Sequence, residues 1–448
     1  MTTLPAATPS GDRQPYGDRR QGRRRHWALL FVAVCLAATN LRMTITGVGP
    51  LLDDIAADQG VSPAVLGLLA SIPMVVWGLV SPLAQGFAAR IGLDPAVAWS
   101  LVVLIAGTVW RSLPGSPLNL WLGTALIGVA LAIANVLLPA TIKRDFGSRV
   151  PLVMGLYSTL LSGTAAIGAG IVAPIAHAEL PSGEPLGWRI ALLATGTMAL
   201  PALIVWLWAS RRRRADPAPA AGVDAASSRT PASAGASDGT APAARSAAPA
   251  RPARLGLRIW RDPVAWAIAL YMGTQSSTFY IWATWLSPID LSRGQDPITA
   301  GFNVMVYHVC GMIGSLVAPF ISRGAMRRIL PVLLPIGAGI GAAGLILVPS
   351  ALPLWLVVCG LTSGCALSIT LTFMVTRASD AASAAATAGM SQSVGYGLSA
   401  LGPILFGWLH GISGEWGLPL VVLLVGIFVQ LLAGISLSRE RMVFGPRV

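Results

Sequence analysis

Long apolar runs, separated by short polar segments, follow one another along most of the chain. A helix of about 20 apolar residues crosses the roughly 30 Å of hydrocarbon in a bilayer. Strands of a membrane barrel would be shorter and would alternate polar with apolar residues, unlike these runs. The pattern therefore predicts an all-α membrane protein with twelve transmembrane helices. They are expected over residues 27–52, 64–90, 95–113, 117–142, 151–178, 187–209, 263–288, 298–322, 329–349, 352–376, 383–410 and 417–438.

One segment breaks this pattern and divides the chain into two halves. Residues 210–261 are rich in Ala, Pro, Ser and Arg and have few large apolar side chains. Such a composition cannot bury enough surface to fold, so we expect a disordered linker. The predicted organisation is a cytoplasmic tail (1–26), a six-helix bundle (27–209), a cytoplasmic linker (210–261), a second six-helix bundle (262–438) and a second cytoplasmic tail (439–448).

The two halves resemble each other in sequence. GLVSPL (78–83) matches SLVAPF (315–320), and GVALAI (128–133) matches GCALSI (364–369) at nearly the same offset. Six helices lie between the equivalent segments, so the repeats share one orientation across the membrane. This arrangement is typical of transporters whose two pseudo-symmetric bundles are related by an axis along the membrane normal.

Two helices carry glycine rows with identical spacing, at 155, 163 and 168 and at 389, 397 and 402. Helices in lipid attract each other mainly through close backbone approach, which small residues permit. We expect the two glycine-bearing helices, one from each half, to pack tightly together. Packing alone and a hinge-like sliding role both fit the pattern.

Charge placement indicates orientation in the membrane. The chain is 54% hydrophobic and 11% charged, with a net charge of +13. With the N-terminus in the cytoplasm, 27 of the 31 Lys and Arg residues fall on the cytoplasmic side, as the positive-inside rule requires. We expect a multi-pass protein of the cytoplasmic (inner) membrane with both termini in the cytoplasm. No basic stripe is interleaved with aromatic residues, so nucleic acid is not an expected partner.

Arg42 stands out because it interrupts the first apolar run. It lies 15 residues after Trp27, which is roughly 22 Å along a helix and therefore beyond the midplane. The side chain could reach the outer interface by snorkelling, or it could face a central cavity and meet an anion. The polar neighbours Asn40, Thr44 and Thr46 favour a water-filled pathway. Arg111 ends the third run, and there we expect snorkelling.

Other polar side chains inside the predicted spans either form a binding site at the interface of the halves or make structural hydrogen bonds between helices. They are Trp77, Asn135, Tyr271, Gln275, Tyr280, Asn303, Gln392 and Tyr396. His308, near the midplane, is either a packing residue or a proton-handling group. No Asp or Glu falls in the middle of a predicted span. If solute transport is coupled to proton movement, the proton would be carried by His308, by Asp53 and Asp54 at the outer rim, or by the substrate itself. Otherwise the protein is a uniporter.

Several stretches give the chain a family resemblance. NLRMTITGVGPLL (40–52), NVLLPATIKRDFGSRVPLVMGLYST (135–159), GWR (187–189), YMGTQSSTFYIWATWL (271–286) and GMSQSVGYGLSALGPILFGWLHGISGEW (389–416) resemble the cyanate-permease and 2-nitroimidazole-exporter branch of the major facilitator superfamily. The resemblance implies a central cavity between two bundles and movement of small anions or nitro-aromatic compounds. It implies substrate binding by Asn40, Arg42, Gln275, Gln392 and Tyr396, to which we add Tyr280.

One loop departs from the superfamily's pattern. The segment between the second and third helices normally reads G-x-L-a-D-R-x-G-R, but here it is GFAARIG, with Ala89 at the acidic position. Arg90 is retained. We expect Arg90, Arg144 and Asp145 to take part in gating at the cytoplasmic side.

The sequence therefore predicts a secondary active transporter for a small anionic or electron-rich, cyanate-like solute. An exporter of drug-like or nitro-aromatic compounds is the alternative, and a non-transporting membrane sensor is a distant one. Paired carboxylates, metal-ligand clusters and activated nucleophiles are missing from the spans, so an enzyme is not expected. The four cysteines lie within apolar spans without metal spacing. We expect no metal or cofactor, and a monomer whose partners are the bilayer and its small-molecule substrate, with protons as a further candidate.

Overall fold

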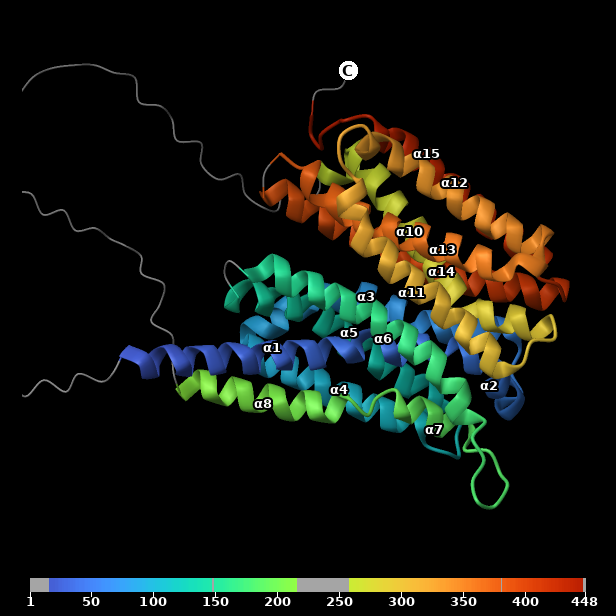
Figure 1. The fold of residues 1–448 in the computed structure, drawn as a ribbon, viewed down its shortest axis with the longest axis horizontal. Coiled ribbons are helices and arrows are strands. Elements are labelled where there is room, and N and C mark those ends of the chain that lie inside the picture. Colours follow the sequence, from blue (N-terminus) through green and yellow to red (C-terminus); the bar gives the residue numbers. More distant parts are fainter. Residues whose placement is uncertain (1–15, 147–148, 216–257, 380, 446–448) are drawn as a thin grey trace, which may run out of the picture.

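The computed structural model describes residues 16–146, 149–215, 258–379 and 381–445 (Figure 1). The N-terminal half contains α1 (Tyr16–Thr46), η1 (Gly49–Leu51), α2 (Leu52–Gln59), α3 (Pro63–Ile91), α4 (Leu93–Ser112), α5 (Leu118–Asp145), α6 (Val150–Ala176), α7 (Gly187–Ala194) and α8 (Ala199–Ala215). The C-terminal half contains η3 (Ile259–Arg261), α10 (Pro263–Ser292), α11 (Pro297–Ile321), α12 (Met326–Leu347), η4 (Pro349–Ala351), α13 (Leu352–Thr376), α14 (Ala381–Ser413) and α15 (Gly417–Ser438). The described part of the chain is helical apart from loops and one isolated bridge.

The long helices coincide with the predicted spans. Nine helical segments within the described ranges are long and apolar enough to cross a membrane. The 30-residue helix α10 is not among them, because the polar stretch from Thr274 to Thr278 lowers its hydropathy. Polar residues in a long, buried helix are a sign that it lines the interior of the protein instead of facing lipid.

Two predicted helices are interrupted. The first span ends at Thr46 and passes through the short turn η1 into α2, where Pro50 occupies the first turn of η1. The sixth span is split into α7 and α8 by a turn over residues 195–198. Each break leaves backbone carbonyls at a helix C-terminus without an intrahelical partner.

Part of the predicted linker is helical. Helix α8 continues to Ala215, six residues into the predicted linker 210–261. At the far side of that segment, η3 covers residues 259–261. The remaining residues of the prediction, 216–257, lie outside the described residues, as do residues 1–15 of the predicted N-terminal tail.

The two halves lie side by side along their length. In Figure 1 the half from α1 to α8 runs from blue to green and the half from α10 to α15 from yellow to red. Helix α3 packs against α14, and α6 packs against α11, so each half supplies two helices to the interface. We call the end of the bundle at which α1 begins and α15 ends the tail end, and the opposite end, which holds α2, the α2 end.

The prediction that the two glycine-bearing helices pack against each other is wrong. The two glycine-bearing helices, α6 and α14, pack across the halves against α11 and α3 and not against each other. Gly168 of α6 lies against Met43 of α1, where an added Cβ would be 2.9 Å from the carbonyl oxygen of Met43. Spacing identifies a residue that permits close approach, but it does not reveal which helix approaches.

The halves make their closest contacts at the α2 end. A Cβ on Gly49 would collide with the carbonyl oxygen of Ala283 across the interface. A Cβ on Gly67 would be 2.5 Å from the carbonyl oxygen of Pro403, and one on Gly170 would be 2.6 Å from the Met305 sulfur. At Gly49 and Gly67, therefore, only glycine lets the backbones of the two halves approach this closely; at Gly170 the neighbouring group is a flexible methionine side chain.

The same helices are loosely surrounded at the tail end. Four of their glycines have no atom within 4 Å of an added Cβ: Gly78 and Gly86 of α3, Gly155 of α6 and Gly389 of α14. The interface is thus closed at the α2 end and open toward the tail end.

Candidate functional site

Arg42 lies at the interface between the halves. It is four residues before the end of α1, and its guanidinium NH1 donates a hydrogen bond of 2.6 Å to the hydroxyl of Tyr280 on α10. The side chain is partly exposed. Of the two interpretations left open by the sequence, the structure supports the inward-facing one, because the guanidinium contacts the opposite half.

Aromatic rings surround the guanidinium. Its central carbon lies 5.8 Å from the ring centre of Trp77, 5.4 Å from that of Phe279 and 5.6 Å from that of Tyr280. Trp77 also packs edge-on against Tyr396 of α14, with ring centres 5.4 Å apart. We call Trp77, Phe279, Tyr280 and Tyr396 the aromatic cage. Rings stabilise a cation through their negative faces, and no carboxylate is among the contacts described for Arg42.

His308 lies behind this cage. Its ring centre is 5.2 Å from Phe279 and 5.3 Å from Tyr307, and the side chain is 2% exposed. Its Nε2 has no hydrogen-bond partner in the described part of the chain. These contacts fit a packed aromatic cluster, and a proton-handling role for His308 stays a prediction.

Gln392 belongs to the open side of the site. It is exposed and precedes Tyr396 by four residues on α14, so both side chains lie on one face of that helix. Gln392 is one turn closer to the tail end than Tyr396. A solute that reaches Arg42 from the tail end would therefore pass Gln392 first.

Two predicted binding residues do not contact Arg42. Asn40 is buried and its Nδ2 donates to the carbonyl oxygen of Leu36 in the same helix; residues two apart on a helix point in different directions. Gln275 is also buried, and its Nε2 donates to the Ser363 carbonyl oxygen at 3.2 Å, linking α10 to α13. Both amides make intramolecular contacts in this structure.

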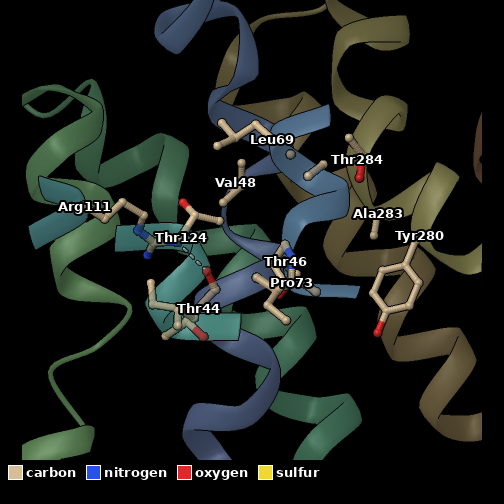
Figure 2. A pocket seen from close by; sticks show the side chains of 14 residues that line it. Thr44, Thr46, Val48, Leu69, Pro73, Arg111, Thr124, Tyr280, Ala283 and Thr284 are labelled. Atoms are coloured by element: carbon tan, nitrogen blue, oxygen red, sulfur yellow. Dashed lines mark hydrogen bonds between the residues drawn. The ribbon is translucent and has the colours of Figure 1, made fainter. Parts of the chain in front are cut away.

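A small cavity lies beside Tyr280 of the aromatic cage (Figure 2). Its volume is about 20 Å³, and on the order of 10–15 Å³ is needed to hold one water molecule. Threonine hydroxyls from both halves line it: Thr44, Thr46, Thr124 and Thr284, beside Tyr280 and Arg111. The polar lining continues from Arg42 toward the closed end of the interface.

Arg111 contradicts the prediction that it snorkels to the membrane surface. It is 1% exposed, and its NH1 donates to the carbonyl oxygen of Thr44 at 2.9 Å (Figure 2). Its NH2 donates at 3.4 Å to the carbonyl oxygen of Leu192 and to Oγ1 of Thr195. These acceptors belong to the C-terminal ends of α1 and α7 and to the turn after α7. The guanidinium satisfies orphan carbonyls at the negative ends of two helix dipoles.

The predicted gating residues have different surroundings. The guanidinium of Arg144 contacts Asp145 at 3.0 Å and Asp94 at 2.5 Å. Asp94 lies in the first turn of α4, five residues after Ala89, so it supplies an acid near the loop in which the family's acid is missing. Arg90 is exposed, and no hydrogen bond of its side chain is described. Sequence reasoning missed Asp94 because it lies outside the family's motif.

The sequence also missed Asp290. Helix α10 extends to Ser292, beyond the predicted end at residue 288, and thereby includes this carboxylate. The side chain is fully buried, and Oδ2 accepts a hydrogen bond of 2.8 Å from Nδ2 of Asn303 on α11. Its other oxygen, Oδ1, has no partner among the described residues.

The family model described as Major Facilitator Superfamily matches residues 30–403. This chain is a member of the Major Facilitator Superfamily. A 2-nitroimidazole transporter of Escherichia coli (strain K12) is 33% identical over 416 residues, which cover 92% of this chain and 96% of that protein. The cyanate transport protein CynX of the same organism is 28% identical over 389 residues, covering 86% and 91%.

The superfamily fold is also found among solved structures. A bacterial homologue of the human lysosomal transporter Spinster aligns with a TM-score of 0.75 at 15% identity, covering 93% of this chain and 97% of that one. The relatives support the branch that contains nitroimidazole and cyanate transporters. The chain is therefore a transporter of the superfamily and not an enzyme.

Proposed function

We propose that the protein is a monomeric secondary transporter that moves a small anionic or electron-rich solute, cyanate-like in its chemistry, by alternating access. Arg42 supplies the positive charge that attracts the solute. Tyr280, Tyr396 and Gln392 orient it by hydrogen bonds at the interface between the halves. Asn40 and Gln275 serve this site indirectly, by holding α1 and α10 in place.

One observation carries the proposal: a cation between the two halves whose described neighbours are aromatic rings and one hydroxyl. Placing an arginine at the centre of a membrane helix costs about 2.5–3.5 kcal/mol. Cation–π contacts offset part of this cost, but a solute anion offsets more of it when it binds. The site thus has a net charge that an anionic solute neutralises.

The aromatic cage supports the alternative within the same class. The rings of Trp77, Tyr280 and Tyr396 provide flat apolar faces beside the guanidinium. A planar nitro-heterocycle could stack on such a face while its nitro oxygens accept hydrogen bonds from Arg42. The relative named as a 2-nitroimidazole transporter makes this the second candidate.

The geometry of the interface supports alternating access. The halves are in contact at the α2 end and open toward the tail end, which is the arrangement expected of one of two access states. The positive-inside distribution supports a cytoplasmic location for the tail end. We therefore propose a protein of the cytoplasmic membrane with both termini inside, in its inward-open state.

Ligand binding to purified full-length protein tests the site. Cyanate and 2-nitroimidazole are titrated against wild type and Arg42→Gln while the melting temperature is measured. We expect at least one of the two to stabilise the wild type and neither to stabilise Arg42→Gln. The control is Arg149→Gln, which removes a guanidinium stacked 4.6 Å from Trp27 at the tail end and is expected to bind like wild type. Equal stabilisation of Arg42→Gln would contradict the proposal.

Flux distinguishes a transporter from a sensor. The solute that stabilises the protein is loaded into proteoliposomes, and exchange across the bilayer is measured. Binding without exchange would favour the sensor interpretation. Competition by cyanate against labelled 2-nitroimidazole shows which solute the site prefers.

A further inference from the structure

Asp290 is the carboxylate with the most complete burial in the described part of the chain. Its exposed fraction is 0%, whereas the next most buried acid, Asp262, is 9% exposed. Asp262 caps the first turn of α10 by accepting from the backbone N–H groups of Val264 and Ala265. Asp290 has no comparable set of donors, and the interpretation of the site given above does not use it.

The contacts of Asp290 stabilise an ionised carboxylate poorly. Its carboxyl group receives one described hydrogen bond, from Asn303, and Oδ1 receives none. It lies in the last turn of α10, where the negative end of the helix dipole disfavours an anion. The nearby cation Arg293 directs its NH2 to the carbonyl oxygen of Leu345, at 2.8 Å, and not to the carboxylate. A buried carboxyl group of this kind is most stable when it carries a proton.

Beside Asp290, helix α10 packs against the opposite half at the α2 end. Its neighbours Leu286 and Ile289 belong to one apolar cluster with Leu51 and Ile55 of the opposite half. The backbone carbonyl oxygen of Ala283, two turns earlier on α10, lies directly against Gly49 of the opposite half. Separation of the halves at this end would remove these apolar side chains from α10 and admit water near Asp290.

We propose that Asp290, with Asn303, forms a proton-binding site whose occupancy is linked to closure of the α2 end. The ligand is one proton: the carboxyl group holds it when the halves close here, and the carboxylate releases it to solvent when they separate. Asn303 can donate to Oδ2 in both forms. This inference rests on the proposed alternating access and adds a second site to it, distinct from Arg42 and from His308.

The proposal implies that the opening of the α2 end depends on pH. Because the closed state binds one proton more than the open state, acid favours closure of the α2 end and alkali favours its opening. Other titratable or charged groups lie at this end and must be controlled for. They include Asp53, Asp54 and Asp58 on α2, His177 after α6, Arg189 on α7, Arg293 after α10, Asp296 before α11 and His410 on α14.

Infrared difference spectroscopy of full-length protein in liposomes tests proton occupancy without any solute. The carbonyl band of a protonated carboxylic acid should be present in wild type at neutral pH and lost in Asp290→Asn. Asp296→Asn is the matched control: Asp296 is an exposed acid six residues away that caps α11 by accepting from the Thr299 N–H. A band that persists in Asp290→Asn, or that is missing from wild type, overturns the inference whatever the protein transports.

Spin-label distances test the link to closure. Labels at Ala57→Cys on α2 and Ser350→Cys in η4, both exposed positions at the α2 end, are introduced after replacement of the four native cysteines. We expect the distance to lengthen with rising pH in this background and to stay at its low-pH value when Asp290→Asn is added. His177→Gln and His410→Gln should keep the pH response. A pH response in Asp290→Asn equal to that of the background would overturn the link, and a distance that ignores pH in every variant would do the same.

Discussion

The two ends of the interface share the helices α3, α6, α11 and α14 but differ in how closely the two halves approach; at the α2 end η1 and α10 also take part. At the α2 end, Gly49, Gly67 and Gly170 meet atoms of the opposite half at distances that a side chain could not allow. At the tail end, Gly155 and Gly389 have no neighbour within 4 Å of an added Cβ. The repeat in the sequence makes the two halves alike, whereas the structure is asymmetric from one end to the other.

The comparison shows how small residues can serve a transporter. In lipid, helices gain free energy from close contact, so glycines that pack tightly in one state stabilise that state. Glycines with open space around them are available for contact in another state. Closure at one end and opening at the other can then be nearly balanced in free energy, as alternating access requires.

The largest expected effect is a loss of thermal stability, and it should distinguish a buried arginine at the α2 end, Arg111, from an arginine at the tail end, Arg144. Arg111→Met removes the side-chain donor to the buried carbonyl oxygen of Thr44. The carbonyl oxygen of Leu192 loses one donor and keeps the hydroxyl of Thr195. Each unsatisfied buried acceptor costs about 1–3 kcal/mol, so we expect a strong loss of thermal stability, measured by melting of the purified protein.

Arg144→Met is the counterpart at the tail end. Its partly exposed ion pairs with Asp94 and Asp145 are worth about 0–1 kcal/mol, so the melting temperature should change little. An Arg111→Met protein that melts as close to wild type as Arg144→Met does would show that Arg111 is not structural.

The next effect concerns closure itself. Gly49→Ala places a methyl group against the Ala283 carbonyl, and overpacking of this kind costs about 1–3 kcal/mol. The closed state should lose population about tenfold or more, because about 1.4 kcal/mol corresponds to a factor of ten. Spin-label distances across the α2 end should lengthen.

Gly155→Ala provides the contrast for this substitution. It adds the same methyl group in open space at the tail end, so the distance across the α2 end should stay at the wild-type value. An unchanged distance in Gly49→Ala would mean that the α2 end closes without this contact.

A smaller effect distinguishes the two glutamines. Gln275→Ala loses the hydrogen bond to Ser363, and we expect it to lower stability by about 1 kcal/mol. Gln392 is exposed toward the tail end, so Gln392→Ala should leave stability unchanged and weaken solute binding about threefold to tenfold, the value of one hydrogen bond. Binding titrations and melting curves of both variants measure the difference. The reverse pattern would move the binding site toward Gln275.

The smallest effect lies at the exposed surface of the tail end. Glu440 accepts a hydrogen bond of 3.0 Å from Arg328, which lowers the pKa of Glu440. A lowered folded-state pKa stabilises the protein above the unfolded value of about 4.3, and this contribution is lost as pH falls through the folded pKa. Glu440→Gln should therefore melt slightly below wild type at pH 7, and the two melting temperatures should converge at pH 3. A difference that grows toward acid would contradict this assignment.

The helices could be predicted from the sequence because spans depend on local apolar length, which the described helices follow. Arg42 was identified because its charge is costly wherever it lies in such a run. Arg111 was misjudged because its acceptors, at Thr44 and Leu192, are carbonyls exposed by helix breaks that the apolar pattern does not reveal. Asp290 was overlooked because helix length past residue 288 depends on packing. The partners of the glycine rows likewise depend on which helices meet in space.

Flux through wild type and Arg42 variants in proteoliposomes tests the central claim, that a guanidinium between the halves binds the solute. Exchange of labelled cyanate and labelled 2-nitroimidazole is measured for wild type, Arg42→Gln and Arg149→Gln after equal insertion and melting temperature have been checked. We predict that Arg42→Gln loses about tenfold to a hundredfold or more of the flux, the effect of one charge-assisted hydrogen bond or more, while Arg149→Gln keeps it. Wild-type flux in Arg42→Gln would contradict the account.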